Sequence, residues 1–235
     1  SGFRHALDRN DLPTVSEIVD LELKGKMHFI RPACLVGMDE LYQSDPTGAL
    51  RLDDAVLPRL LAFRLTYDIG ENPAWVVVLA QERPTLVAEV FLAYALPLLR
   101  AGKKHVGGLH LLAYNDTYSG IARIVLPPLL EGFPLRARKH QLGNALDPLL
   151  KAALGHLDKK ALASVVERKL KLGSMDAAQR VYWLACGLII SPTVYTAKLL
   201  QHIGKSKVRQ GYLAGFLHDR WERGFSYASL PETVL

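Results

Sequence analysis

Hydrophobic residues recur along most of this chain with the period of an α-helix. In residues 53–67, for example, one apolar stripe runs through Val56, Leu60, Phe63 and Tyr67. Side chains three or four residues apart lie on the same face of a helix, whereas a half-buried strand would alternate strictly between apolar and polar residues. This segment is therefore predicted to form an amphipathic helix with a wide buried face.

The same period predicts helices over most of the remaining chain, at 14–24, 33–43, 84–101, 107–114, 118–131, 140–156, 159–172, 176–190, 192–203 and 207–222. The run 74–80 is rich in valine, as strands are, but Asn72-Pro73 precedes it. Because proline suits the first turn of a helix and no partner strand is evident, we predict a short helix there.

Turn residues separate these segments, and one such turn is predicted at 44–48. Short connections between helices imply antiparallel hairpins. The predicted fold class is therefore all-α, an α-solenoid of antiparallel helix hairpins similar to degenerate HEAT or armadillo repeats.

A short leucine-rich element that contains proline occurs four times along the chain. The leucine pairs of successive copies are 38, 31 and 20 residues apart. Helix-pair repeats are about 33 to 47 residues long, so this spacing fits a degenerate solenoid. A proline inside a helix removes a backbone hydrogen bond and bends the axis, so we predict a bent helix at each copy. The copies are Val56–Leu61, Ala95–Leu99, Val125–Leu130 and Ala145–Leu150.

With 235 residues, of which 49% are hydrophobic, the chain can bury a sizeable core, and we predict one helical-repeat domain over 1–235. Residues 1–50 are rich in turn signals and are expected to cap the stack or to link it to a preceding region. Because the chain begins Ser1-Gly2 without an initiator methionine, we expect a fragment of a longer protein.

The longest apolar stretch, 86–99, is shorter than the about 18 residues that a membrane helix needs, and no signal peptide is visible. We therefore expect a cytoplasmic protein without a membrane partner. Two cysteines lie inside apolar helical segments, which is typical of buried, reduced thiols.

The net charge of +6 is distributed unevenly along the chain. Residues 1–117 hold 12 Lys and Arg against 15 Asp and Glu, whereas residues 118–235 hold 17 against 8. A basic surface can bind the phosphates of nucleic acid, dock an acidic partner or simply face solvent. Base-stacking aromatic residues are not interleaved with these charges, as binding of single strands would require. The candidate basic surface consists of Arg136, Arg138, Lys139, Lys159, Lys160, Arg168, Lys169, Lys171, Lys205, Lys207 and Arg209.

Catalytic and cofactor-binding motifs are not recognisable in the sequence. Gly204-Lys205-Ser206 resembles the end of a Walker A loop, but Leu199 stands where that loop needs a glycine. No His or Cys pair has the spacing of metal ligands, and no nucleophile elbow occurs. We therefore predict no catalytic residues, no metal and no cofactor, while an enzyme whose catalytic groups meet only in the folded chain stays open.

Residues 179–195 carry a distinctive motif, which begins Gln179-Arg180-Val181-Tyr182-Trp183-Leu184-Ala185-Cys186-Gly187-Leu188 and continues to Pro192 and Tyr195. This pattern resembles the C-terminal helical-repeat (HEAT-like) region of large bacterial NACHT/STAND-type NTPases, and the resemblance covers 141–203 best. It implies a sensor or scaffold portion that recognises a partner, foreign or phage-derived, without catalysis.

The motif residues also have a purely structural interpretation. Tyr182 and Trp183 are expected to fill a gap between helices, Gly187 to permit a close helix approach and Pro192 to start the next helix.

The sequence thus predicts a non-catalytic helical-repeat scaffold or sensor that binds a protein or peptide partner, within a bacterial defence NTPase. The alternative is a HEAT-like nucleic-acid-binding protein, including a DNA-repair enzyme, that uses the basic face of the C-terminal half. The two predictions differ in geometry, because a duplex requires the basic clusters to line one continuous groove.

Overall fold

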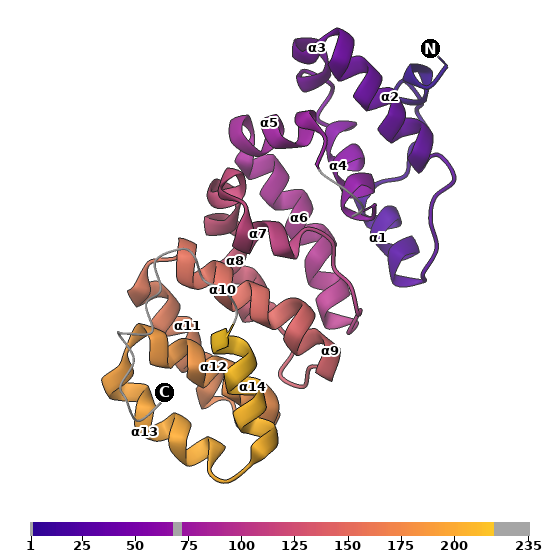
Figure 1. Ribbon diagram of the computed structural model, residues 1–235. Helices are drawn as coiled ribbons and strands as arrows, with labels where there is room; N and C mark the ends of the chain where they lie inside the picture. The colour runs from indigo at the N-terminus through magenta and orange to yellow at the C-terminus, as the bar shows by residue number, and fades with distance from the viewer. Residues whose placement is uncertain (1, 68–71, 219–235) are drawn as a thin grey trace. The chain divides into compact units, whose positions relative to one another are not determined.

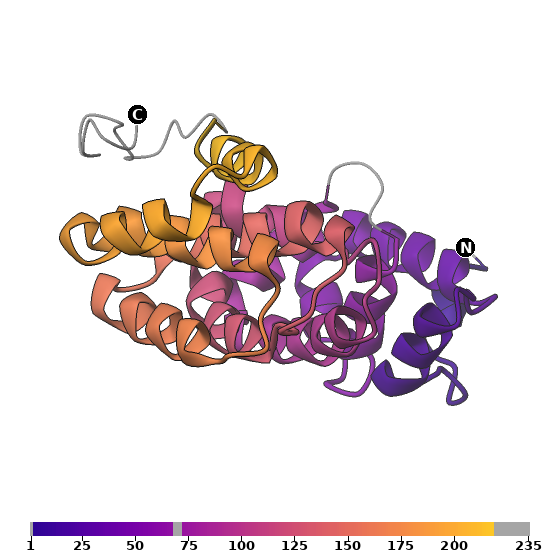
Figure 2. The ribbon, with the colours of Figure 1, turned by 90° about the horizontal axis from the view of Figure 1, so that it is seen from below.

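The computed structural model describes residues 2–67 and 72–218, and these residues form helices joined by short loops without any strand (Figures 1 and 2). The all-α prediction is thereby confirmed. The chain divides into two compact units, Ser1–Val125 and Leu126–Leu235, and the division falls within α8 (Ser119–Gly132). No helix in the described ranges has both the length and the apolar character needed to cross a bilayer.

The first unit is built from helices that pack around α4 and α6. In chain order its elements are η1 (Arg4–Ala6), α1 (Val15–Leu23), α2 (Arg31–Ser44), α3 (Pro46–Leu50), α4 (Leu57–Leu65), α5 (Ala74–Glu82), α6 (Pro84–Arg100), α7 (Leu109–Tyr114) and η2 (Asp116–Tyr118). α1 packs against α4 and α6, and α2 packs against α4. The first 50 residues therefore contribute helices to the core of this unit.

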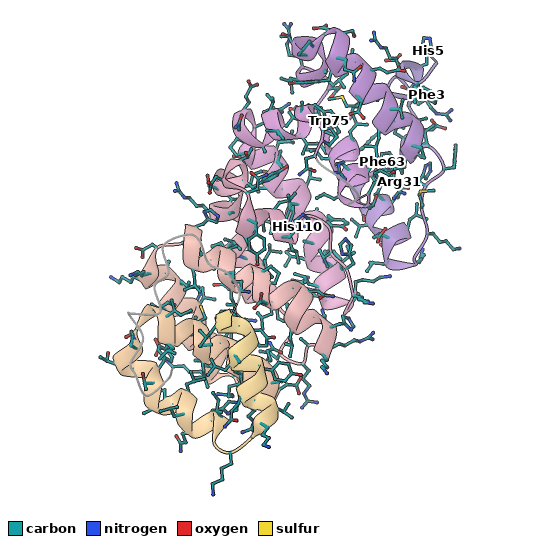
Figure 3. The ribbon with its side chains drawn as sticks, viewed as in Figure 1. Phe3, His5, Arg31, Phe63, Trp75 and His110 are labelled. Carbon is teal, nitrogen blue, oxygen red and sulfur yellow. The ribbon has the colours of Figure 1, made fainter. Side chains whose placement is uncertain are left out.

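Local sequence signals position several of these helices. α1 begins at a capping box, in which Thr14 Oγ1 accepts from the Glu17 amide at 3.3 Å and Glu17 Oε2 accepts from the Thr14 amide at 2.7 Å. The predicted short helix at 74–80 is confirmed as α5, and its Trp75 points into the unit (Figure 3). Trp75 Nε1 donates to Asp39 Oδ1 at 2.8 Å, which ties α5 to α2.

The second unit is arranged around α12, which packs against helices on both sides of it in the chain. Its elements are α9 (Lys139–Gln141), the π-helix η3 (Leu142–Leu146), α10 (Asp147–His156), α11 (Lys159–Lys171), α12 (Ala177–Ile190), α13 (Pro192–Ile203) and α14 (Lys207–His218). Trp183 on α12 is fully buried, as the motif predicts. The arrangement of the helices as a HEAT-like solenoid stays a prediction, as does a single domain over the whole chain.

The four leucine-proline elements share burial but not helix geometry. Each of their eight paired leucines is at most 3% exposed. The prediction of a bent helix at every copy is wrong for the first one, because Pro58 lies in the first turn of α4. A backbone N–H has no partner within the helix at that position, so the proline removes no hydrogen bond. Pro97 and the pair Pro127 and Pro128 lie inside helices, whereas Pro148 is the second residue of α10, just after the π-helix and Asp147.

The predicted turn at 44–48 is also wrong in part, because it contains the beginning of α3. Asp45 accepts a hydrogen bond from the Gly48 amide at 2.8 Å, and Pro46 occupies the first turn, so two turn-forming residues start a helix instead. The last predicted helix, 207–222, is observed as α14 up to His218, and its remaining residues lie outside the described ranges.

Candidate functional site

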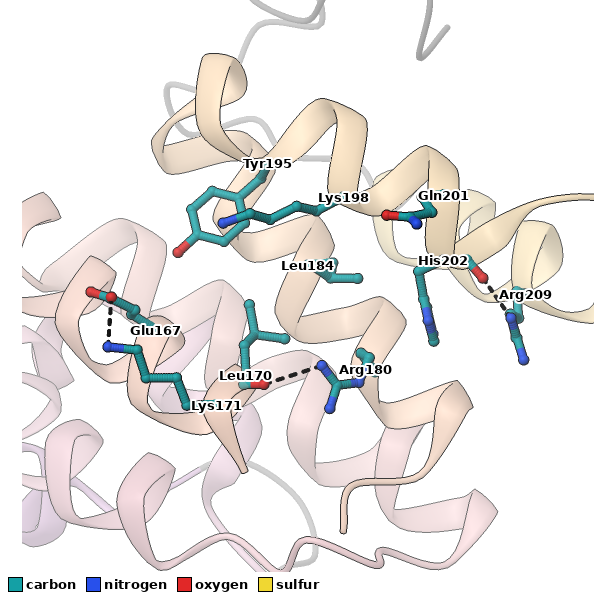
Figure 4. Close-up of a pocket in the computed structure, with 10 residues that line it drawn as sticks. All are labelled: Glu167, Leu170, Lys171, Arg180, Leu184, Tyr195, Lys198, Gln201, His202 and Arg209. Carbon is teal, nitrogen blue, oxygen red and sulfur yellow. Dashed lines mark hydrogen bonds and ion pairs between the residues drawn. The ribbon is translucent and has the colours of Figure 1, made fainter. Parts of the chain in front are cut away.

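The second unit contains an open pocket of about 550 Å³ on α11, α12, α13 and the beginning of α14 (Figure 4). Four of its lining side chains are cationic and one is a carboxylate, so the pocket is a candidate site for anions. The lining residues are Glu167, Leu170, Lys171, Arg180, Leu184, Tyr195, Lys198, Gln201, His202 and Arg209.

Arg180 on α12 is held in the pocket by the C-terminal end of α11. Its Nη1 donates to the carbonyl oxygen of Leu170 at 3.1 Å, and its Nη2 donates to that of Leu172 at 3.3 Å. Carbonyls at a helix C-terminus have no partner within their own helix, and the helix dipole favours a cation there. Arg180 therefore caps α11, and in the described structure three of its five N–H groups remain for other contacts.

His202 and Arg209 lie beside Arg180. Nε2 of His202 is 2.9 Å from the carbonyl oxygen of Ala177, so this nitrogen carries the hydrogen. Ala177 is three residues before Arg180 on α12, about one helical turn. Nη1 of Arg209 donates to the His202 carbonyl oxygen at 2.5 Å, and the His202 ring lies between the two guanidinium groups in Figure 4. We call Arg180, His202 and Arg209 the cationic end of the pocket.

The opposite end of the pocket contains its carboxylate. Lys171 Nζ lies 2.8 Å from Glu167 Oε1, one turn away on α11, and this hydrogen bond holds the pKa of Glu167 below its usual value. Both side chains are more than half exposed, so their ion pair contributes little to stability. Lys198 Nζ lies 5.2 Å from the centre of the Tyr195 ring, at cation–π distance.

The floor of the pocket is apolar and depends on a glycine. Leu170 and Leu184 line it, and the ring of Tyr195 closes it where α13 crosses α12. A Cβ atom on Gly187 would lie 2.8 Å from the Tyr195 ring, closer than real side chains approach. The sequence prediction that Gly187 permits a close helix approach is therefore confirmed, and this approach places α13 beside the pocket.

Two of the eleven basic residues selected from the sequence, Lys171 and Arg209, line the pocket. Arg168 and Lys169, which precede Lys171 on α11, do not line it. Arg168 forms an ion pair with a glutamate of α8, while Lys169 is buried and donates to the carbonyl oxygen of Phe133 at 2.8 Å. Burial lowers the pKa of Lys169. Lys169 belongs to the core of the unit rather than to a basic surface.

The remaining seven residues of the candidate basic surface are not part of the pocket. Lys159 and Lys160 begin α11, so they lie about 18 Å along the helix from its C-terminal end. Arg136 Nε donates to the Ser174 carbonyl oxygen at 3.5 Å. The other four residues flank the beginnings of α9 and α14, and they are Arg138, Lys139, Lys205 and Lys207.

Sequence reasoning missed three of the basic groups that line the pocket, Arg180, Lys198 and His202. Each of them is isolated in the sequence, so a search for charge clusters passes over it. A signal was present on α13, where Lys198, Gln201 and His202 recur at the spacing of one helix face. Their proximity to Arg180 could not be predicted without knowing how α13 packs on α12.

Comparisons with known proteins leave this pocket without an assigned ligand. No protein-family model, no curated protein and no solved structure matches the chain. Within the described residues, no group of three or more His, Cys, Asp or Glu side chains is placed to hold a metal ion.

Proposed function

We propose that this chain is a non-catalytic helical binding module whose C-terminal unit holds an anionic segment of a protein or peptide partner. The observation that carries this proposal is the pocket, in which four cationic side chains from four helices face one carboxylate above an apolar floor. Its volume of about 550 Å³ lies within the range of ligand pockets, about 300–1,000 Å³. A pocket of this size accommodates one or two side chains of an extended segment.

The mixture of groups in the pocket favours a peptide. An acidic side chain is attracted by Lys198 and the cationic end, while an adjacent apolar side chain can rest on Leu184 and Tyr195. Arginine and tyrosine are the residue types that most often dominate protein interfaces, because each combines a large contact area with directed hydrogen bonds. The pocket therefore offers both affinity and orientation to a short acidic and apolar motif.

The alternative function, nucleic-acid binding by a basic face, has less support. A duplex needs a continuous row of cations for its phosphates. Of the eleven candidate residues, two line the pocket, Lys169 is buried and Arg168 is paired. The variants described below distinguish binding of nucleic acid from binding of a peptide.

The wider context belongs to the same proposal. The HEAT-like solenoid rests on the helical period and the repeated leucine pairs, and the origin in a bacterial defence NTPase rests on the motif at 179–195. In such a protein the module would act as a sensor or scaffold, and its partner would be recognised through the pocket.

A peptide-binding assay with a matched pair of variants tests the proposal. Lys198 is suited to substitution because it is exposed and, among the described residues, its ammonium has no hydrogen bond or ion pair. Lys198→Glu should weaken binding of peptides from an acidic and apolar library by about tenfold or more, since it replaces an attractive charge with a repulsive one. Lys205→Glu makes the same change of charge outside the pocket and should leave affinity within about twofold.

Affinities are measured by fluorescence anisotropy at several salt concentrations. Absence of any acidic peptide that binds below millimolar concentration, or equal loss in both variants, would overturn the proposal. Micromolar binding of duplex DNA that is weakened by Lys205→Glu but not by Lys198→Glu would instead support the nucleic-acid alternative.

A further inference from the structure

We infer that the pocket recognises a phosphoryl group, carried by a phosphorylated serine, threonine or tyrosine side chain of the partner. This inference rests on the proposed function, because it specifies which anion of the peptide the pocket binds. The phosphoryl group is assigned to the cationic end, formed by Arg180, His202 and Arg209.

Hydrogen bonds orient the two guanidinium groups of the cationic end before any ligand binds. Arg180 is anchored by two carbonyls at the end of α11, and Arg209 is anchored by the His202 carbonyl in the last turn of α13. These bonds use two donors of Arg180 and one of Arg209, out of five on each side chain. A planar guanidinium binds two oxygens of a phosphoryl group side by side, and anchoring it beforehand lowers the entropy lost on binding.

The side chains that line the pocket carry a surplus of positive charge. Lys171, Arg180, Lys198 and Arg209 stand against Glu167 alone, which leaves three net positive charges when His202 is neutral. A carboxylate of the ligand brings one negative charge and two oxygens, whereas a phosphoryl group brings about −1.5 to −2 charges and three oxygens at pH 7. The phosphoryl group therefore matches the pocket better in both charge and number of acceptors.

The charges are distributed unevenly within the pocket. The carboxylate of Glu167 bonds Lys171 on the same helix, α11, so it does not neutralise the cationic end. In Figure 4 Leu170 and Arg180 lie between the Glu167–Lys171 pair and the other two residues of the cationic end, His202 and Arg209. Lys198 lines the same pocket, where its ammonium lies over the Tyr195 ring, and its long, flexible stem allows the ammonium to turn toward a bound phosphoryl group.

Three oriented peptide libraries, with a central phosphoserine, glutamate or serine, test this inference on the whole chain. We expect the phosphoserine library to bind about tenfold tighter than the glutamate library, since a phosphoryl group adds one to three charge-assisted hydrogen bonds. Binding of the glutamate library as tight as that of the phosphoserine library would overturn the phosphoryl assignment and leave the proposed function intact. Failure of both libraries to bind would overturn the two together.

Competitors identify the source of the phosphoryl group. Inorganic phosphate at millimolar concentration should displace the phosphopeptide, and a single-stranded oligonucleotide should displace it no better than phosphate does. Binding of free phosphate without any preference for a phosphopeptide would contradict the assignment to a peptide. Displacement by micromolar oligonucleotide would assign the pocket to nucleic acid instead.

A pair of arginine variants tests the role of the planar fork. Arg209→Lys keeps the charge but loses the fork, which pairs with two oxygens of either anion, so affinity for the phosphopeptide should fall by about tenfold and affinity for the glutamate library should fall as well. The control Lys205→Arg should change neither. If Arg209→Lys lowers thermal stability, Lys198→Gln serves as the second variant, because it breaks no hydrogen bond in the described structure. Lys198→Gln must then weaken binding of the phosphopeptide more than binding of the glutamate library.

Discussion

The contact between Gly187 and Tyr195 allows a quantitative test of how the pocket is built. In Gly187→Ala the new methyl group would lie 2.8–2.9 Å from three atoms of the Tyr195 ring. Tyr195 is buried, and the closest atoms include the ring carbon nearest its backbone, so the side chain cannot simply swing away. α13 must therefore move off α12, and the pocket must change shape.

The expected magnitude follows from two opposing effects. Overpacking of a tight core contact costs about 1–3 kcal/mol, whereas replacing a helical glycine by alanine gains about 1 kcal/mol. Gly155 on α10 provides the matched control, because a Cβ atom there would meet nothing within 4 Å. Gly155→Ala should stabilise the protein by about 0.5–1 kcal/mol, and Gly187→Ala should be about 1–3 kcal/mol less stable than Gly155→Ala.

Urea denaturation of both variants, followed by circular dichroism, measures this difference. In a Tyr195→Ala background the ring is gone, so Gly187→Ala should regain the stabilising effect that Gly155→Ala has. The reasoning is refuted if the two alanine variants differ by less than about 0.5 kcal/mol, or if the removal of the Tyr195 ring leaves the cost of Gly187→Ala unchanged.

Three further predictions concern two buried residues of the second unit and one buried thiol of the first. The buried side-chain amide of Gln179 accepts from the Ala137 backbone amide at 3.2 Å and donates to the Pro134 carbonyl oxygen at 2.8 Å. Because both backbone groups lose their partner, Gln179→Leu should lower the free energy of unfolding by about 1–3 kcal/mol in urea titrations. Unchanged stability would contradict this. Phe216→Ala removes a buried ring whose centre lies 5.7 Å from that of Tyr182, against which it packs edge-on. Hydrogen exchange should therefore quicken in α14, and phosphopeptide affinity should fall as Arg209 leaves the pocket. Equal quickening in α11 would argue against a local effect. Burial raises the pKa of Cys34 from 9.0 to about 11, so the unfolded chain loses this proton first and stability should fall as pH rises from about 9 to 11. Urea titrations over this range should show a smaller fall for Cys34→Ala than for the unsubstituted chain, and equal slopes would refute this assignment.

Most of the helical structure could be predicted from the sequence, because the signals that start and maintain a helix are local. The period of the apolar residues identifies the buried face of a helix. The beginning of α1 is marked by the capping box of Thr14 and Glu17, a signal that is only four residues long. The errors arose where one local signal has two meanings. Asp45-Pro46 is typical of a turn and equally of a helix start, and Pro58 begins a helix rather than bending one.

The role of individual charges was less predictable, although one signal was available. Lys169 shares the apolar face of α11 with Leu162 and Val166, at intervals of three and seven residues, so its position already indicates burial. The acceptor that makes this burial tolerable, the Phe133 carbonyl, lies 36 residues earlier in the chain. Only the packed structure brings the two together.

The sequence by itself determined the all-α class and the excess of positive charge in the C-terminal half, since these depend on residue type and on the period along each helix. Tertiary structure alone decided which cations share a pocket. Arg180, Lys198 and Arg209 come from three helices, and they line one pocket because α13 and α14 both pack on α12. A binding site of this kind depends on distances between helices, which the pattern of a single helix does not contain.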